Sequence, residues 1–565
     1  MPSEAHTPKC RATVRPGTFD PVLAICAGAS LEETEPGGRV GPVVVTAERA
    51  SRSTPRTSVW RSPAAYRTGA LTLALLSGVI AAAAFPRGPA TGTEVAMLMV
   101  GCLLVGTVAG WAMRSRWATI VAPALHLAAF ETLRFTIFDR PGATLDPPSF
   151  DATMGVLLFL VVHVMYVVVA AGPMVLGAIG GAAIARRQAS RTSPPPVPRT
   201  ARRRALSYAG RGGRWVLTAA QAAGVVLLGA QLVLPGRVAP ITGPDGEPVP
   251  GSIATLEKIR LGGVDQWVSI RETSVDNPVL LHLSGGPGTS DVGWVRTFNR
   301  ALEDHFTVVV WEQRGAGKSY PALDPTETFT LDGLITDGID LARWLCDRFD
   351  EQKIYLTGNS WGSTLGVLMV QRNPELFWAY VGTGQMVSQR ATDRELYYQL
   401  LDFADRIGDT GLREQMLAFG EPPYREVLAY AKVMEYYDAL EPYQRTAEFE
   451  AARGLRGFFP DEYSLLDTWN EIRGFADMGG LMYPQLQDLD FRVSVPRLDV
   501  PVYFVQGRHE LTARSRFAYE WIAALQAPIK RVYIFDNSGH NPDAEEPERF
   551  NDLMINTVLA ETYGR

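Results

Sequence analysis

One serine lies between two glycines in the stretch GNSWG at 358–362, directly after an apolar run that ends at Leu356. A strand, a tight turn and a helix in this order hold a serine hydroxyl above the edge of a sheet, and the turn needs small neighbouring residues. The hydroxyl attacks a carbonyl carbon only when a base takes its proton. The pattern therefore predicts Ser360 as a nucleophile and requires a base and an acid elsewhere in the chain.

Four histidines follow residue 250, and His540 is the predicted base. It follows the last apolar run, at 531–535, where a loop can reach back over the carboxyl edge of a parallel sheet. His509 stays open as a weaker rival, because it lies on the loop that carries the predicted acid. The other two lie in or beside apolar runs, which favours structural roles: His282 and His305.

The predicted acid is Glu510, which comes shortly after the apolar run 500–505. The order Ser360, Glu510, His540 is the chain order of α/β-hydrolase triads. Glutamate can stand for aspartate here, because a small shift of the loop accommodates the extra methylene. The alternative is that Glu510 is a surface carboxylate paired with Arg508.

Acyl transfer also needs fixed donors for the negative charge that develops on the carbonyl oxygen. The glycine-rich turn GGPG at 285–288 follows an apolar run and can present such donors. We expect one backbone N–H near Gly286 and another from Trp361. The alternative for this turn is an ordinary Gly-Pro bend.

These residues need a sheet to bring them together, and the chain from Gly251 onward alternates short apolar runs with amphipathic stretches. That alternation predicts an α/β fold. The predicted core covers 251–387 and 489–565, and a mostly helical, aromatic-rich block at 388–488 is predicted to be an inserted cap. The expected strands are 278–283, 306–311, 353–356, 377–381, 500–505 and 531–535, and the expected helices are 294–303, 331–349, 364–372, 514–525 and 547–563.

Four motifs together resemble the prolyl iminopeptidase family of α/β hydrolases, whose members show HGGPG, DQRGxGxS and GGSWGS in that order. The motifs are SGGPGTS at 284–290, WEQRGAGKS at 311–319, GNSWGS at 358–363 and SGHNP at 538–542. The resemblance runs from about Leu256 to the C-terminus. It implies an eight-stranded sheet with a helical cap and release of an N-terminal residue, often proline, from small peptides. By position it implies the same catalytic set: Ser360, His540, Glu510, Gly286 and Trp361.

Three positions depart from the family pattern. Ser284 replaces the histidine of HGGPG, Glu312 replaces the aspartate of DQRG, and Glu510 replaces the usual triad aspartate. The first two lie near the expected oxyanion turn, so they bear on its support and on the substrate pocket. The third leaves the chemistry intact.

The family's exopeptidases hold the free amine of the substrate with carboxylates of the cap, since a buried cation needs a partner. The candidates in the predicted cap are Glu395 and Glu471. The alternative for both is a solvated helix face.

The first part of the chain is basic and apolar. Up to Pro235 it holds about 23 Lys and Arg against about 11 Asp and Glu, although the whole chain has 54 against 60. Four stretches are long and apolar enough to cross about 30 Å of hydrocarbon. They are 68–85, 93–113, 154–185 and 215–234, and a fifth, 117–138, carries His126, Glu131 and Arg134.

Flanking arginines predict how these stretches cross. If the helical region 67–235 holds five spans, every basic segment, including the linker 186–214, falls on the cytoplasmic side. We therefore expect an integral plasma membrane protein with a disordered cytoplasmic tail at 1–66 and its second part outside the cytoplasm. The alternative for 117–138 is an interfacial helix, and the helices as a whole could serve only as an anchor.

Composition excludes several classes of site. The second part has one cysteine, Cys346, so no disulfide can form within it, and neither a CxxC pair nor HExxH occurs. We expect no metal, cofactor or nucleic acid partner, and the oligomeric state stays open. The expected partners are a lipid bilayer and a small peptide or ester substrate. The sequence thus predicts a membrane-anchored serine hydrolase, most simply an aminopeptidase, with an esterase or lipase and a non-catalytic sensor or transporter as alternatives.

Overall fold

The computed structural model describes residues 62–86, 88–136, 153–191, 201–424, 428–453 and 459–564. The tail predicted for 1–66 therefore lies mostly outside the described residues. Its last four residues, 63–66, belong to helix α1, which begins at Pro63. The middle of the predicted linker 186–214 also lies outside them.

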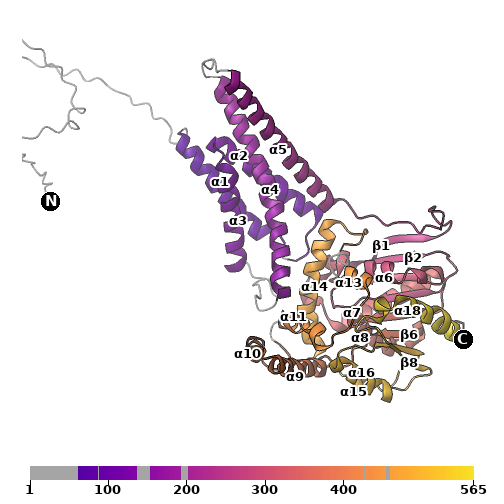
Figure 1. Ribbon diagram of the computed structural model, residues 1–565. Coiled ribbons are helices and arrows are strands. Elements are labelled where there is room, and N and C mark those ends of the chain that lie inside the picture. The colour runs from indigo at the N-terminus through magenta and orange to yellow at the C-terminus, as the bar shows by residue number, and fades with distance from the viewer. Residues whose placement is uncertain are drawn as a thin grey trace, which may run out of the picture. The chain divides into compact units, whose positions relative to one another are not determined.

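The first part is a group of long helices that run beside one another (Figure 1). Two of them begin with clear caps. The Ser62 hydroxyl accepts the Ala65 N–H at the start of the first, and Thr91 and Glu94 form a capping box at the start of the second. The helices are α1 (Pro63–Ala84), α2 (Gly92–Met113), α3 (Ala118–Thr136), α4 (Thr153–Arg191) and α5 (Ala201–Val233).

Glycines allow these helices to pack closely. A Cβ atom on Gly106 of α2 would lie 1.9 Å from the Met174 carbonyl oxygen of α4, and one on Gly78 of α1 would lie 2.2 Å from the His126 carbonyl oxygen of α3. Only residues without a side chain fit at such contacts, which are typical of packed membrane helices.

Among the residues that the structure describes, four helical segments are long and apolar enough to cross a membrane: Pro63–Ala84, Gly92–Met113, Gly155–Arg191 and Trp215–Val233. They match the four predicted apolar stretches, although α4 and α5 continue into the predicted basic linker. The fifth predicted stretch is a helix, α3, but it is not among the four.

The second part is built on one eight-stranded sheet with the order β1-β2-β4-β3-β5-β6-β7-β8. β1 and β2 form an antiparallel hairpin, β2 pairs antiparallel with β4, and all later pairs are parallel. The six predicted strands are present, and the hairpin was missed. The strands are β1 (Ile253–Leu261), β2 (Val264–Glu272), β3 (Val279–Leu283), β4 (Thr307–Glu312), β5 (Ile354–Asn359), β6 (Phe377–Thr383), β7 (Val502–Gly507) and β8 (Lys530–Phe535).

Helices cover both faces of this sheet, as a mostly parallel sheet requires. α7 (Leu331–Phe349), α8 (Trp361–Arg372) and α16 (Thr512–Ala524) contribute to one apolar core. α6 (Val292–Phe298) and α18 (Pro547–Leu553) contribute to the other. The expected α/β-hydrolase architecture is therefore confirmed.

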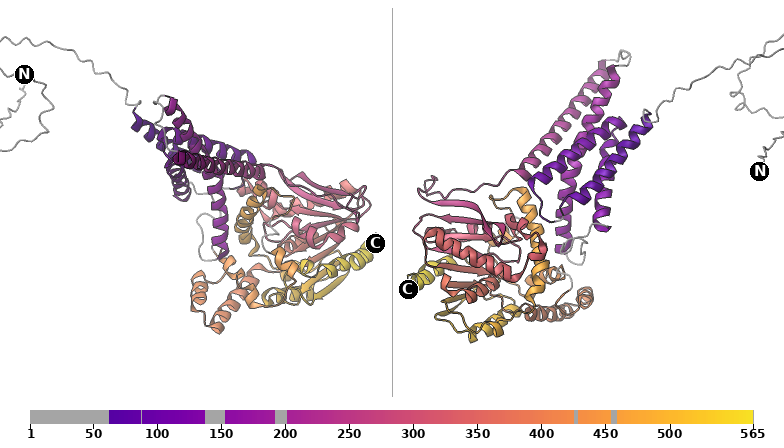
Figure 2. Two further views of the ribbon diagram at one scale, coloured as in Figure 1. Left: turned by 45° about the horizontal axis from the view of Figure 1, so that its top comes forward. Right: turned by 180° about the vertical axis from the view of Figure 1, so that it is seen from behind.

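The described chain between β6 and β7 is helical and forms the cap (Figure 2). This block agrees with the predicted absence of strands at 388–488. Its helices are α9 (Gln389–Ile407), α10 (Thr410–Phe419), α11 (Leu428–Met434), α12 (Tyr437–Leu440), α13 (Ala447–Arg453), α14 (Leu465–Leu486) and α15 (Phe491–Ser494).

Helix α14 of the cap also contacts the chain that joins α1 to α2. The Asn470 amide donates to the Ala90 carbonyl at 2.9 Å and accepts the Ala90 N–H at 3.2 Å. Trp469 stacks on Phe85 with ring centroids 6.2 Å apart. The longest cap helix is thus held by residues that lie about 380 positions earlier in the sequence.

An Asn470→Ala variant should be less stable, because both buried polar groups of Ala90 lose their partner. Each unpaired group costs about 1–3 kcal/mol. We expect a lower thermal unfolding midpoint for the detergent-solubilised chain. Asn556→Ala is the matched control, since Asn556 is exposed on a helix. Equal midpoints for the two variants would show that the contact contributes nothing to stability.

Candidate active site

Ser360 occupies a sharp turn between β5 and α8. Its φ of 52° and ψ of −117° are rare for a residue with a side chain. Such strain is common where a nucleophile is presented. The flanking glycines are required, because a Cβ on Gly358 would lie 2.4 Å from the Gly362 oxygen and one on Gly362 would lie 2.0 Å from the Leu283 oxygen.

The three residues of the predicted triad lie in one hydrogen-bonded row. His540 Nε2 is 2.9 Å from Ser360 Oγ, and His540 Nδ1 is 2.5 Å from Glu510 Oε2. The imidazole therefore has an acceptor on one nitrogen and the serine hydroxyl on the other. This is the arrangement in which a histidine can take the serine proton.

Glu510 is almost fully buried and held as a carboxylate. Its Oε1 accepts the Leu511 N–H at 2.9 Å and lies 3.3 Å from an Arg514 nitrogen. Burial alone would raise the pKa of Glu510, but the charges of His540 and Arg514 outweigh burial and lower it to about 2. An ionised carboxylate next to Nδ1 is what stabilises an imidazolium.

The loop that carries His540 is fixed from both sides. The Asn359 amide donates to the His540 carbonyl oxygen at 3.2 Å. Glu545 accepts the N–H groups of Gly539 and Asn541 at 3.1 and 3.0 Å. Neither Asn359 nor Glu545 was singled out in the sequence.

The rival base, His509, lies elsewhere. Its Nδ1 is 3.5 Å from Glu441, and its ring stacks on Tyr443 at 4.8 Å. His282 is also engaged, since its Nε2 lies 3.0 Å from Asp291. Arg508, the alternative partner of Glu510, pairs with Asp536 instead.

The glycine-rich turn lies beside the serine, and Gly286 has a φ of 107° that favours glycine. Gly286, Ser360 and Trp361 line the same pocket. Asp291 accepts the Gly285 N–H at 3.2 Å and so braces the turn.

Gln313, from the WEQRG motif, ties this turn to α8. Its amide nitrogen donates to the Ser284 carbonyl at 3.2 Å, and its oxygen accepts the Trp361 indole N–H at 2.8 Å. The two segments expected to supply oxyanion donors are therefore held by one side chain.

Two departures from the family pattern also support this turn. The Ser284 hydroxyl accepts the Asp291 N–H at 3.1 Å. Glu312 is buried, and it accepts the Ser290 hydroxyl at 3.2 Å and the Lys318 N–H at 2.9 Å. Burial raises the pKa of Glu312 to about 7.

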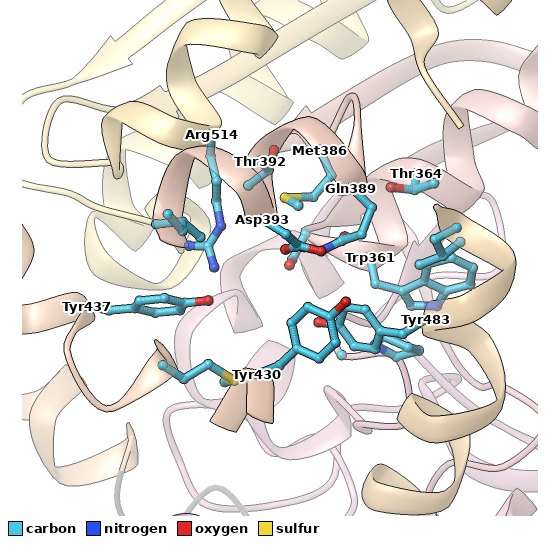
Figure 3. A pocket seen from close by; sticks show the side chains of 16 residues that line it. Trp361, Thr364, Met386, Gln389, Thr392, Asp393, Tyr430, Tyr437, Tyr483 and Arg514 are labelled. Atoms are coloured by element: carbon cyan, nitrogen blue, oxygen red, sulfur yellow. The ribbon is translucent and has the colours of Figure 1, made fainter. Parts of the chain in front are cut away.

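A pocket extends from Ser360 into the cap (Figure 3). On the cap side the pocket is lined by Asp393 of α9, which is only 5% exposed. Asp393 Oδ1 accepts the Gln389 amide at 2.8 Å, whereas Oδ2 has no hydrogen-bond partner among the described residues. The pocket is lined by Gly286, Pro287, Ser360, Trp361, Thr364, Met386, Gln389, Thr392, Asp393, Leu396, Tyr430, Met434, Tyr437, Tyr483, Leu486 and Arg514.

The two carboxylates expected to bind a substrate amine are not among the residues that line this pocket. Glu395 is partly exposed and lies 3.1 Å from Arg516 of α16. Glu471 is buried, and it accepts the Ser290 N–H, just after the glycine-rich turn, at 3.2 Å. Burial raises the pKa of Glu471 well above its usual range. Within the described ranges, no group of three or more potential metal ligands comes together.

Comparisons with known proteins agree with this architecture. A family model described as alpha/beta hydrolase fold matches residues 278–547. "Probable aminopeptidase YbaC" of Bacillus subtilis (strain 168) is 31% identical over 307 residues, which are 54% of this chain and 96% of that protein. A proline iminopeptidase of Heyndrickxia coagulans is 23% identical over 299 residues, or 51% of this chain and 93% of that protein.

Among solved structures, a proline iminopeptidase-related protein of Thermus thermophilus has 18% identity and a TM-score of 0.40, over 55% of this chain and 98% of its own. The residues that the family model matches, 278–547, contain all four motifs that resemble the prolyl iminopeptidase family. The second part of this chain is therefore a hydrolase that belongs to the prolyl iminopeptidase family of α/β hydrolases.

Proposed function

We propose that this protein is a membrane-anchored serine hydrolase that releases N-terminal residues from small peptides. The observation that carries the proposal is the continuous row Ser360 Oγ, His540 and Glu510, with spacings of 2.9 and 2.5 Å. Ser360, the first member of this row, lines a pocket that extends into the cap. The aminopeptidase names of its relatives support the same reaction class.

In the acylation step, Ser360 Oγ attacks the carbonyl carbon of the scissile peptide bond while His540 Nε2 takes its proton. Glu510 stabilises the imidazolium through Nδ1. The negative oxygen of the tetrahedral intermediate is held by backbone N–H groups near Gly286 and at Trp361. When the intermediate collapses, the C–N bond breaks and His540 gives its proton to the leaving amine.

Deacylation uses the same groups in the same order. His540 takes a proton from a water molecule, which attacks the ester carbonyl of the acyl-enzyme. The C–O bond to Ser360 then breaks, and His540 returns its proton to the serine. The products are the free amino acid and the shortened peptide.

Asp393 is the group best placed to bind the substrate amine. It is buried, it lines the pocket, and its Oδ2 is without a partner among the described residues. Burial raises the pKa of Asp393 to about 7, against the lowering effects of Gln389 and Arg514. A buried carboxylate in this state gains most from a cation, because the cation relieves the cost of burying its charge.

An Asp393→Asn variant should therefore lose kcat/KM for aminoacyl p-nitroanilides by about tenfold to a hundredfold, the range for a charged hydrogen bond. For wild type, the activity on these substrates relative to an aryl ester should rise from about pH 6 to about pH 7, because Asp393 loses its proton in this range while the substrate amine stays mostly protonated. The variant should show a flat ratio. Glu395→Gln is the matched control on the same helix and should behave as wild type. The reverse pattern would assign the amine to Glu395.

The helices α1 to α5 are proposed to cross the membrane, with the hydrolase outside the cytoplasm. Close packing of α3 against α1 at Gly78 and His126 supports a place for α3 inside the bundle. Five crossings put the arginines before α1, between α2 and α3, and between α4 and α5 on the cytoplasmic side. Protease digestion of right-side-out vesicles should then remove the hydrolase, whereas inside-out vesicles should protect it.

A substrate panel on the detergent-solubilised full chain tests the reaction. We expect cleavage of aminoacyl p-nitroanilides with a free amine and a large loss on N-acetylation of the same compounds. An esterase would instead hydrolyse p-nitrophenyl esters and ignore free-amine substrates. A chain that only binds ligands would cleave neither class.

A further inference from the structure

The pocket that extends from Ser360 into the cap is lined by a cationic side chain, Arg514, as well as by the anionic Asp393. Arg514 on α16 lines it together with Asp393, and Figure 3 shows both side chains extending into the same space from different helices. The Arg514 side chain is only 10% exposed. A guanidinium at that depth needs anionic or polar partners on more than one side.

Glu510 pairs with only one nitrogen of the Arg514 guanidinium. Nη1 lies 3.3 Å from Glu510 Oε1, and the guanidinium packs over the Tyr437 ring at 4.5 Å from its centroid. The buried Nε donates to none of the described residues. Asp393 Oδ2 also makes no hydrogen bond among the described residues, although Tyr430 and Gln487 lie close enough to lower the Asp393 pKa. The pocket therefore holds a guanidinium N–H and a carboxylate oxygen that a ligand can pair with.

Three tyrosines of the pocket add neutral hydroxyl groups. Burial raises the pKa values of Tyr430, Tyr437 and Tyr483, so their hydroxyls stay protonated at neutral pH. In Figure 3 the three rings lie below Arg514 and Asp393 and form an aromatic wall of the pocket. A simple apolar residue such as proline would satisfy Asp393 with its amine but would leave Arg514 facing carbon.

We propose that the preferred acyl group carries both an ammonium and a carboxylate, with the ammonium on Asp393 and the carboxylate on Arg514. This inference rests on the proposed serine aminopeptidase reaction and narrows its substrate class. Two substrate types share this chemistry. One is an N-terminal acidic residue, which presents its side-chain carboxylate, and the other is a γ-glutamyl amide, which presents its α-carboxylate.

Four p-nitroanilides separate these cases on the detergent-solubilised full chain. α-Glutamyl p-nitroanilide is compared with the glutaminyl compound, which is nearly isosteric but uncharged. γ-Glutamyl p-nitroanilide is compared with 4-aminobutanoyl p-nitroanilide, which lacks only the carboxylate. We expect kcat/KM to favour the charged member of at least one pair by about tenfold or more, since a site built for a polar group discriminates strongly against its absence. The pair that shows the preference identifies the substrate type.

The Arg514→Met variant tests the assignment to this side chain. In this variant the charged and the uncharged member of the pair should be cleaved with about equal kcat/KM. If Arg514 served only to hold Glu510, the variant would slow both members by the same factor and the preference would remain. Arg514→Lys keeps the charge and should keep part of the preference, which covers the case in which the methionine variant does not fold. Arg516→Met, an exposed neighbour on α16, is the matched control and should keep the full preference.

Two outcomes overturn the inference in distinguishable ways. If prolyl or leucyl p-nitroanilide is cleaved but neither charged compound is preferred, the substrate class is wrong and the proposed reaction stands. If no p-nitroanilide is cleaved by a chain that is folded by circular dichroism, the proposed reaction fails and the inference fails with it.

Discussion

A Ser360→Ala variant should hydrolyse aminoacyl p-nitroanilides at least about 10⁴-fold more slowly than wild type, because removal of the nucleophile of a triad leaves only binding and oxyanion stabilisation. The hydroxyl lies 2.9 Å from His540 Nε2 and lines the pocket. Alanine should fit the turn without a new contact. Steady-state kcat on the detergent-solubilised chain is the measurement.

The control for this variant is Ser494→Ala, which removes the hydroxyl of an exposed serine in α15. It should retain wild-type kcat. A Ser360→Ala enzyme that keeps more than about a tenth of the wild-type rate would exclude Ser360 as the nucleophile.

The second large effect is expected at Glu510. Glutamine preserves the shape of the side chain, but its neutral amide no longer stabilises an imidazolium and can favour the wrong tautomer of His540. In a triad this change lowers kcat by about 10⁴-fold with little change in geometry. We expect Glu510→Gln to bind substrate with a similar KM and to turn it over very slowly.

The same variant should change how stability depends on pH. The folded-state pKa of Glu510 is about 2, below its usual value of 4.5, so its ionised form stabilises the fold above about pH 4.5. This contribution is lost as the pH falls from about 4.5 toward 2. Urea midpoints measured from pH 5 to pH 3 should fall less steeply for Glu510→Gln than for wild type. Parallel curves with a near-normal kcat would remove Glu510 from the triad.

Most of the sheet was predictable from the sequence, because its central strands are short apolar runs bounded by glycine, proline or polar residues. β3 and β7, for example, are buried along their whole length. The β1–β2 hairpin was missed because β1 is only partly buried and both strands carry charged residues among their apolar ones. The Gly262-Gly263 pair between them was the available signal for a tight hairpin turn.

The triad was accessible to sequence reasoning because each of its residues follows a predicted strand, and parallel strands end at one edge of the sheet. The structure brings Ser360, Glu510 and His540 into hydrogen-bond contact. Their catalytic roles stay predictions. Asp291 and Gln313, which brace the glycine-rich turn beside Ser360, belong to no strand pattern, so only the three-dimensional arrangement shows their contacts.

The cap shows why the substrate side was harder to predict. Glu395 and Asp393 are two positions apart on α9, and residues at that spacing face nearly opposite sides of a helix. Asp393 lines the pocket, while Glu395 lies near Arg516. Without knowing which face of α9 turns toward the sheet, the sequence offers no reason to choose the aspartate.

Reaction of the full chain with a fluorophosphonate probe tests the central claim most directly, because only a serine activated by a neighbouring base is phosphonylated rapidly. We predict one modified tryptic peptide, with the probe on Ser360, and no labelling of Ser360→Ala or of heat-denatured wild type. Equal labelling of wild type and Ser360→Ala, or attachment to another residue, would contradict the account.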